Sequence, residues 1–390
     1  MEFLRTQRLC LHLIGFSFKK NESRVLKLYS LLSWTSILFI IIPEAHFVIE
    51  NLTDIPLATD ALCTQFTSML SLMKIATLYF KKDTFYRIIE QLDNMWRKSS
   101  TSDRRILEEG NTIDKRLTLV YLVSSMLVAV LYLLFPIVKG IYDLFTTGAA
   151  EWIMPMRSIF IYDISASPNY ELTYLWFVQC TGLAVFGSVG VDCLFYGSSL
   201  NISSHFKIIQ KKARNIKFDQ LMIKRNARYT TNRVATEEFF GLIKQHQKIL
   251  NICEEFEEMY STILFAQFLT TSAQLCVIAF QLTLPNQQLI MMATFVLFLS
   301  AICFQLFTYC HAGSQLTAES LAVAEAIYDS NWYEATPLIR QLIAFFLMRS
   351  QKSVIMSSGF YVANLETFNA ILSAAGSYIA ILQSLSEENN

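Results

Sequence analysis

Residues 259–318 contain no Asp, Glu, Lys or Arg. About twenty apolar residues are enough for one helix to cross the roughly 30 Å hydrocarbon core of a membrane, so this stretch has room for two crossings. The sequence LPNQQ at positions 284–288 divides it, because proline and asparagine favour a turn. Across the chain 53% of residues are hydrophobic and 16% are charged, a balance typical of an integral membrane protein.

Other apolar stretches predict five further spans, which gives an all-α fold, an integral membrane seven-helix bundle. Asp60 and Lys74 lie near the two ends of the second span, and we expect their side chains to snorkel to the membrane interfaces. Asp192 lies near the end of the fourth span, where an interfacial anchor or a local hydrogen bond is expected. The seventh span is expected at about residues 368–385, and the first six at about residues 28–49, 57–80, 117–139, 170–198, 259–284 and 289–311.

The basic residues predict the orientation of this bundle. All 32 Lys and Arg residues except Lys74, Lys139 and Arg157 fall before the first span or in alternate loops. Cytoplasmic loops carry the Lys and Arg excess, so we expect a cytoplasmic N-terminus and an extracellular C-terminus. A G-protein-coupled receptor has the opposite orientation and is disfavoured. The N-L-T sequon at Asn51 falls in an outer loop, where glycosylation acceptors lie.

The segments on the predicted cytoplasmic side have apolar residues at helical spacing. In residues 235–259 this pattern runs into the fifth span without a breaker, which predicts a helix that projects out of the membrane. Pro337, preceded by Thr336, predicts the start of a short surface helix. We therefore divide the chain into spans one to six with a ligand-binding bundle (residues 1–311), cytoplasmic anchor helices (312–359), and a seventh span with a short outer tail (360–390).

Several classes of function find no support in the sequence. The net charge is zero, so there is no basic field for nucleic acid. The eight cysteines form no C-x-x-C pair and the five histidines show no i, i+4 spacing, so we expect neither a metal nor another cofactor. Glu44 and His46 are expected to form a satisfied interfacial cluster beside Pro43 rather than a metal site. Without a nucleophile and base in a recognisable arrangement, an enzyme is not expected.

The C-terminal motifs resemble those of a known family. Their order is Gly313, Ser320, Ala326, Tyr328, Trp332, then RSQK at 349–352, LETF at 365–368, and Ser377-Tyr378. This order is similar to the C-terminal signature of insect odorant receptors. The resemblance implies an odorant-binding subunit of a ligand-gated, non-selective cation channel with four subunits, which acts with a co-receptor subunit in the plasma membrane of sensory neuron dendrites. A gustatory-type receptor channel of the same superfamily is the alternative.

The resemblance also implies that the seventh helix lines a central pore. At 3.6 residues per turn, Ala370, Ala374, Ser377, Ile381 and Ser384 share one face, which is small or hydroxylated except at Ile381. A tightly packed small-residue interface is the alternative interpretation of this face. Ile381 aligns with the position that closes the pore in the family. The expected pore and gate residues are Ser377, Ile381, Ser384 and Leu385.

In this family the odorant site lies in the outer half of spans two to six. Residues of this chain at that depth are mostly apolar or aromatic, which suits a small volatile organic ligand held by dispersion and desolvation. The candidates are Phe66, Leu70, Tyr132, Phe135, Trp176, Cys180, Leu275, Met291, Phe295 and Phe298.

Overall fold

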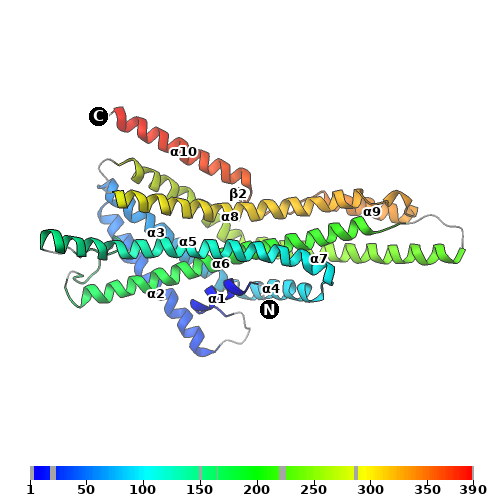
Figure 1. Ribbon diagram of the computed structural model, residues 1–390, viewed down its shortest axis with the longest axis horizontal. Helices are drawn as coiled ribbons and strands as arrows, with labels where there is room; N and C mark the ends of the chain where they lie inside the picture. Colours follow the sequence, from blue (N-terminus) through cyan, green and yellow to red (C-terminus); the bar gives the residue numbers. More distant parts are fainter. Residues whose placement is uncertain are drawn as a thin grey trace.

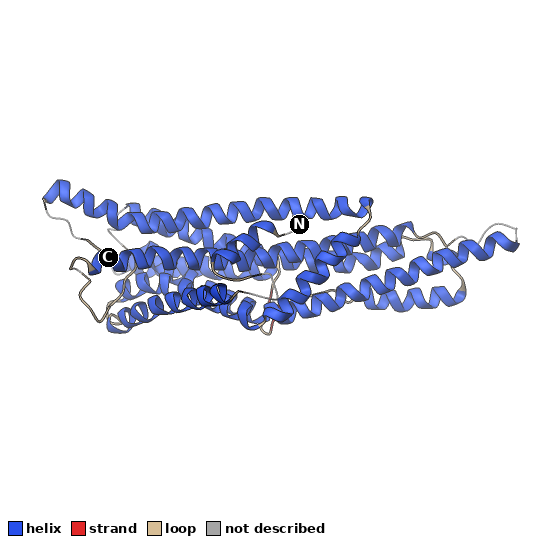
Figure 2. Cartoon of the chain, turned by 90° about the horizontal axis from the view of Figure 1, so that it is seen from below, coloured by secondary structure: helices blue, strands red, loops and turns tan. Residues whose placement is uncertain are grey.

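The chain folds into an elongated bundle whose long helices run along one common axis (Figures 1 and 2). The structure is a computed structural model. It describes residues 4–17, 23–148, 152–164, 166–218, 225–284 and 289–388. Of residues 147, 225–233, 290 and 381–388 it describes the backbone alone. The end of α5, the start of α8 and the end of α10 lie at one end of the bundle, which we call the cavity half (Figure 1). The opposite end, with α9 and the start of α7, is the anchor half.

The described elements are almost entirely helical, as the sequence predicts. The one exception is a hairpin of two-residue strands, in which Ser357 pairs with Val362 and Ser358 with Tyr361. The elements are α1 (Arg5–Leu13), α2 (Arg24–Glu50), α3 (Ile55–Phe80), α4 (Lys82–Lys98), α5 (Thr101–Thr147), α6 (Asn169–Asn215), α7 (Arg225–Thr283), α8 (Leu289–Tyr328), the 3₁₀ turn η1 (Trp332–Glu334), α9 (Pro337–Ser350), β1 (Ser357–Ser358), β2 (Tyr361–Val362) and α10 (Leu365–Glu388).

Local chemistry explains where these helices begin. Side-chain oxygens of Ser23, Asp54 and Ser100 accept hydrogen bonds from backbone N–H groups in the first turns of α2, α3 and α5. Such caps satisfy donors that have no partner within the helix. Helix α9 begins at Pro337, as predicted, and Thr336 occupies the cap position although its side chain makes no capping bond.

In the described part of the chain, five helices are long and apolar enough to cross a membrane by length and composition. The 26-residue α3 and the 24-residue α10, expected as the second and seventh spans, are helical but fall outside this set. The count of seven spans therefore stays a prediction. The five are Arg24–Glu50, Thr101–Thr146, Asn169–Asn215, Val234–Thr283 and Met291–Tyr328.

Several helices are much longer than the apolar stretches that predicted them. Helix α7 has 59 residues, and at 1.5 Å per residue it is about 90 Å long, roughly three times the hydrocarbon thickness. The prediction that residues 235–259 continue into the fifth span is confirmed, because α7 has no break between Arg225 and Thr283. These extensions supply the walls of the anchor half.

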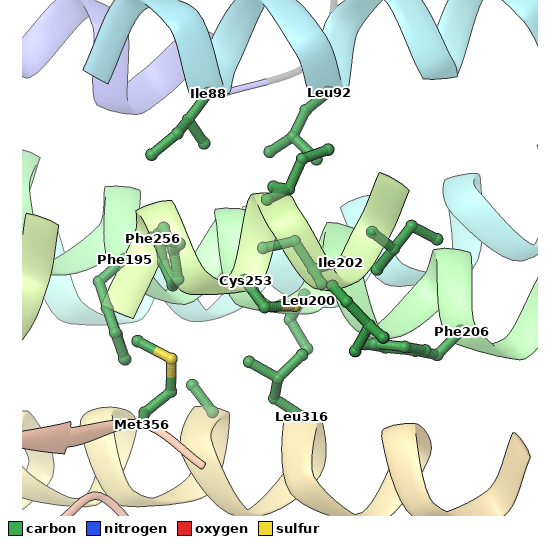
Figure 3. Close-up of a cluster of buried hydrophobic side chains, with 14 of the residues drawn as sticks. Ile88, Leu92, Phe195, Leu200, Ile202, Phe206, Cys253, Phe256, Leu316 and Met356 are labelled. Atoms are coloured by element: carbon green, nitrogen blue, oxygen red, sulfur yellow. The ribbon is translucent and has the colours of Figure 1, made fainter. Parts of the chain in front are cut away.

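In the anchor half, other helices pack against α6 on all sides. Ile88 and Leu92 of α4 point toward α6 and α7, while Leu316 of α8 and Met356 approach from the opposite side (Figure 3). Phe195 is fully buried at the centre, with its ring centroid 5.4 Å from that of Phe256. The anchor half is therefore the densely packed part of the chain.

The hairpin joins the anchor half to α10. Glu257 of α7 holds it, since its carboxylate accepts hydrogen bonds from the backbone N–H (3.3 Å) and the hydroxyl (2.5 Å) of Ser357. From there α10 runs along the edge of the bundle, against α7 and α8 (Figure 1). The hairpin was not predicted from the sequence, because strands of two residues leave no periodic pattern.

Candidate functional site

The cavity half contains a mostly apolar cavity of about 170 Å³. Side chains of α2, α3, α5, α6, α7 and α8 line it, and Met156 of the α5–α6 connection covers one end. Its lining residues are Ile37, Ile40, Cys63, Thr64, Thr67, Ser68, Leu70, Ser71, Tyr121, Ser125, Val128, Ala129, Tyr132, Met156, Cys180, Thr181, Ala184, Val185, Ser188, Val189, Gln274, Thr294, Phe295, Phe298, Ala301, Ile302 and Gln305.

The predicted ligand-binding residues divide into two groups. Leu70, Tyr132, Cys180, Phe295 and Phe298 line the cavity. The remaining candidates, Phe66, Phe135, Trp176, Leu275 and Met291, do not line it. Whether any of the ten binds a ligand stays a prediction.

Packing explains why the second group lies elsewhere. Leu275 is 2% exposed and belongs to a hydrophobic cluster behind Phe295, and Met291 packs against that cluster. Trp176 is 39% exposed on the outer surface of α6. An aromatic side chain suits a lipid-facing surface as well as a cavity wall, so its type alone did not decide its direction.

The sequence analysis missed the polar residues of the cavity wall. Thr64, Ser68 and Ser71 follow one face of α3 at helical spacing, and all three line the cavity. Ser125, Ser188 and Gln305 add polar groups from α5, α6 and α8; these residues, too, were not among the candidates. A row of small polar residues within an apolar helix was the available signal.

A buried ion pair lies next to the cavity. Lys74 Nζ of α3 is 2.7 Å from Asp192 Oδ1 of α6, and the two side chains are 0% and 1% exposed. The expectation that the two side chains reach the membrane interface is therefore wrong, whereas the alternative expected for Asp192, a local hydrogen bond, is confirmed. Taking one such charge into the interior alone is costly, whereas the two together neutralise each other.

Hydrogen bonds complete this ion pair. The hydroxyls of Tyr121 and Tyr309 donate to the Asp192 carboxylate at 2.8 and 2.5 Å, and the Gln305 amide donates at 2.6 Å. Gln305 in turn accepts a hydrogen bond from Gln267 of α7 at 3.0 Å. Tyr121 and Gln305 also line the cavity, so the wall of the cavity is part of a polar network that joins α3, α5, α6, α7 and α8.

The opposite end of the cavity is closed by the segment between α5 and α6. Its Ile159 N–H donates to the carbonyl oxygen of Pro43 in α2 at 3.1 Å. Its Arg157 forms an ion pair with Asp60 of α3, with 3.3 Å between Nε and Oδ2. Asp60 therefore binds a neighbouring segment rather than snorkelling. These two tethers hold Met156 over the cavity.

The expected cluster of Glu44 and His46 does not form. His46 pairs instead with Glu50 one turn further along α2, with 3.0 Å between Nε2 and Oε1. Glu44 is 0% exposed and points into the bundle. Residues 44 and 46 face different sides of α2 because two residues span about 200° of a helix.

The predicted pore residues lie in the last two turns of α10 and just before them. Ser377 is exposed on the helix surface and donates to the carbonyl oxygen of Ser373 at 3.0 Å. The side chains of Ile381, Ser384 and Leu385 lie outside the described part of the structure. The function of all four in a pore stays a prediction.

The fold and the cavity define the chain as a multi-pass helical membrane protein with a mostly apolar cavity. A family model described as 7tm odorant receptor matches residues 54–376. The chain belongs to the insect odorant receptor family, and it is thus a receptor for olfaction rather than an enzyme. The family resemblance of the C-terminal motifs is confirmed, and the gustatory alternative falls away.

Individual relatives match over nearly their full length. The chain is 29% identical to odorant receptor 82a of Drosophila melanogaster, over 97% of this chain and 98% of that receptor. It is 27% identical to odorant receptor 47a of the same species, over 98% and 99%. The solved structure of the olfactory receptor OR5 from Machilis hrabei in complex with eugenol is 15% identical, covers 98% of this chain and 97% of that one, and superposes with a TM-score of 0.80. This last similarity shows that the two proteins share a fold.

Proposed function

We propose that this receptor is the odorant-binding subunit of a ligand-gated, non-selective cation channel and works with a co-receptor subunit in a hetero-tetramer. Its place is the plasma membrane of olfactory sensory neurons, with seven spans, a cytoplasmic N-terminus and an extracellular C-terminus. The observation that carries the proposal is the mostly apolar cavity of about 170 Å³ in a member of the odorant receptor family.

The size and lining of the cavity suit a small volatile molecule. An apolar cavity of about 150 Å³ in a protein core is large enough to bind benzene. The aromatic walls of Phe295 and Phe298 offer dispersion contacts, and Met156 adds apolar surface. OR5, which shares this fold, has been solved with eugenol, itself a small organic compound.

The two faces of α10 support its proposed function as a pore helix. Phe368, Ile371, Leu372 and Ala375 pack against the hydrophobic clusters of the same chain. The opposite face, with Ala370, Ala374 and Ser377, is exposed in the single chain. A small and hydroxylated face without a partner in its own chain suits a water-filled pore shared by four subunits.

Co-expression with the family co-receptor in a non-olfactory cell tests the channel and its ligand site together. Volatile compounds are expected to evoke cation currents that persist in excised membrane without nucleotides. Ala184→Phe fills the cavity and is expected to abolish the response, whereas Val178→Phe on the 41% exposed outer face of α6 leaves it intact. Surface labelling confirms that both variants reach the membrane. Currents that need added GTP, or that are unaffected by Ala184→Phe, would contradict the proposal.

A second experiment addresses the pore. We propose that Ile381 is the contribution of this subunit to a narrow apolar ring that closes the pore, because water retreats from such a constriction and a cation then has no substitute for its hydration shell. Ile381→Ser is expected to raise the ligand-free leak or to alter ion permeation, with odorant selectivity unchanged. Altered selectivity with normal conduction would instead assign Ile381 to a ligand site.

Epitope tags at the two ends of the chain test the orientation. An antibody added to intact cells is expected to reach a C-terminal tag and not an N-terminal one. The expectation rests on the position of the basic residues, all but three of which lie on the predicted cytoplasmic side.

A further inference from the structure

The cavity has a polar floor where it meets the anchor half. Five side chains from four helices converge there, namely Ser71 of α3, Tyr121 and Ser125 of α5, Ser188 of α6 and Gln305 of α8. Tyr121 and Gln305 donate to the same oxygen of Asp192, and the hydroxyls of Ser71 and Ser188 lie 2.8 Å apart. Ser125 lies one helical turn from Tyr121 on α5. We call these five residues the floor.

The far end of the cavity has a different character. Tyr132 lies eleven residues beyond Tyr121 on α5, which places it about 16 Å from the floor. Phe295 and Met156 close this end with apolar surface. Its polar groups are more scattered, and the Thr181 hydroxyl is buried without a hydrogen-bond partner among the described residues.

The floor keeps hydrogen-bonding capacity for a further group. Ser71 and Ser188 share one hydrogen bond between two hydroxyls, which leaves one O–H donor and acceptor lone pairs on both oxygens. The Ser125 hydroxyl has no hydrogen-bond partner among the described residues and borders the cavity. Tyr121 uses its proton on Asp192 but keeps its acceptor lone pairs. The floor can therefore both donate to and accept from a ligand.

The floor offers no unpaired charge. Asp192, the carboxylate behind it, is already neutralised by Lys74 at 2.7 Å. A ligand carboxylate or ammonium at the floor would lose hydration without meeting an opposite free charge there, which is unfavourable. A neutral ligand oxygen loses less hydration free energy, and hydrogen bonds with the hydroxyls of the floor compensate for that loss.

We propose that the floor forms hydrogen bonds with one uncharged oxygen atom of the ligand, so that the receptor takes small alcohols and carbonyl compounds in preference to hydrocarbons, amines and carboxylic acids. The hydrocarbon body of such a ligand extends toward Phe295 and Met156. This inference rests on the proposed function of the cavity as the odorant site, and it makes Ser125 and Ser188 residues that determine specificity.

The experiment compares compounds with the same carbon skeleton. Skeletons of about six to nine carbons, near the size of benzene that such a cavity accepts, are each offered as alkane, alcohol, ketone, primary amine and carboxylic acid. Potency is measured as ligand-evoked current in cells that express the receptor with the co-receptor. The alcohol or ketone is expected to exceed the alkane by roughly three- to tenfold, the usual effect of one neutral hydrogen bond, and to exceed the amine and acid by more.

Variants locate the effect at the floor. The double change Ser125→Ala and Ser188→Ala is expected to reduce the ratio of alcohol to alkane potency roughly three- to tenfold, mainly through the alcohol. Thr181→Val removes the hydroxyl at the far end with little change of shape and is expected to leave the ratio unchanged. The ratio is measured within each variant, so different surface levels do not affect it.

Each result separates the two proposals. Currents that Ala184→Phe abolishes, together with equal potency of alkane and alcohol, overturn the polar floor and leave the odorant site in place. The same holds if the serine variants keep the full ratio, if Thr181→Val loses it, or if a charged compound is the most potent. Absence of any current from every compound, or currents indifferent to Ala184→Phe, overturns the proposed function and this inference with it.

Discussion

The two halves of α6 differ in composition and have opposite surroundings. Residues 169–191 contain one charged residue, whereas residues 192–215 contain five. In the cavity half, Leu172 and Leu175 are 62% and 65% exposed, and the other side of the helix borders the cavity. In the anchor half, Leu194, Phe195 and Ile202 are fully buried by helices on every side. The cavity half of α6 thus has an exposed side and a side that borders the cavity, whereas the anchor half is surrounded by protein. The comparison shows that the more apolar half of the helix is the more exposed one, and that small residues such as Ala184 and Ser188 line its cavity side.

The pairing of Asp192 with Lys74 marks the boundary between the two halves, and breaking it gives the largest expected effect. Asp192→Asn leaves the buried Lys74 charge unpaired, which costs about 3–5 kcal/mol of stability. Thermal unfolding of the purified receptor and its surface fraction measure the loss. Replacing both residues, as Lys74→Met with Asp192→Asn, is expected to cost less because no lone charge remains and the amide oxygen of the new Asn still accepts hydrogen bonds.

A matched control separates this boundary from ion pairs in general. Arg105 and Glu109 form a pair on the surface of α5 with side chains 85% and 67% exposed. Glu109→Gln is expected to change stability by less than about 0.5 kcal/mol. Equal losses from Asp192→Asn and Glu109→Gln would mean that the interior of the bundle is far more hydrated than its packing indicates.

The next prediction concerns the junction between the anchor half and α10. A methyl group on Gly313 of α8 would overlap the carbonyl oxygen of Ala363, just before α10 begins. Gly313→Ala is therefore expected to destabilise the receptor by roughly 1–3 kcal/mol and to impair channel opening. In the cavity half, Gly182 of α6 has no atom near that position, so Gly182→Ala is expected to stabilise by about 0.5–1 kcal/mol. The two variants are expected to shift the melting temperature in opposite directions. A Gly313→Ala variant with an unchanged melting temperature would show that the backbone at Ala363 moves aside at little cost.

The sequence predicted the helical elements well, because apolar stretches and helix caps are local signals. Pro337, for example, begins α9 as expected. The partner of Lys74 was beyond such reasoning, since Asp192 lies 118 positions away and the pairing depends on how α3 packs against α6. The hydropathy of the sequence placed both charges near the ends of spans. It gave no information about which way their side chains point around the helices.

The cavity was only partly predictable for a related reason. Depth along a helix follows from the sequence, and Leu70, Tyr132 and Phe298 were selected at the right depth. Direction around the helix does not, so Trp176 was selected too, although it is exposed on the surface. Ser125 was not predicted, because a volatile ligand favours apolar contact residues. A serine hydroxyl in a helix is, moreover, usually bonded to the backbone of its own helix.

A smaller effect is expected inside the anchor half, where the packing is not uniformly favourable. His205 of α6 is 2% exposed, and neither ring nitrogen has a hydrogen-bond partner among the described residues. A buried polar group without a partner destabilises the fold, so His205→Leu, of similar volume, is expected to stabilise the receptor by about 1 kcal/mol. His12→Leu at an exposed position is the control and is expected to have no such effect. A loss of stability in His205→Leu would indicate a hydrogen bond that forms in the assembled channel.

The smallest expected effect on stability comes from enlarging an alanine of the cavity wall, and it compares the two halves of α6 directly. Ala184 borders the cavity, so the larger side chain of Ala184→Leu enters open space and is expected to change stability by less than about 1 kcal/mol. Ala213, on the same helix in the anchor half, is 0% exposed, and Ala213→Leu must displace packed neighbours at a cost of about 1–3 kcal/mol. Ligand potency is expected to show the reverse order, because Ala184→Leu takes up ligand space and Ala213→Leu lies far from it. Thermal unfolding ranks the two variants by stability, and ligand-evoked currents rank them by ligand potency. If Ala184→Leu is as destabilising as Ala213→Leu, the cavity half is packed as densely as the anchor half and the proposed odorant site has no room for a ligand.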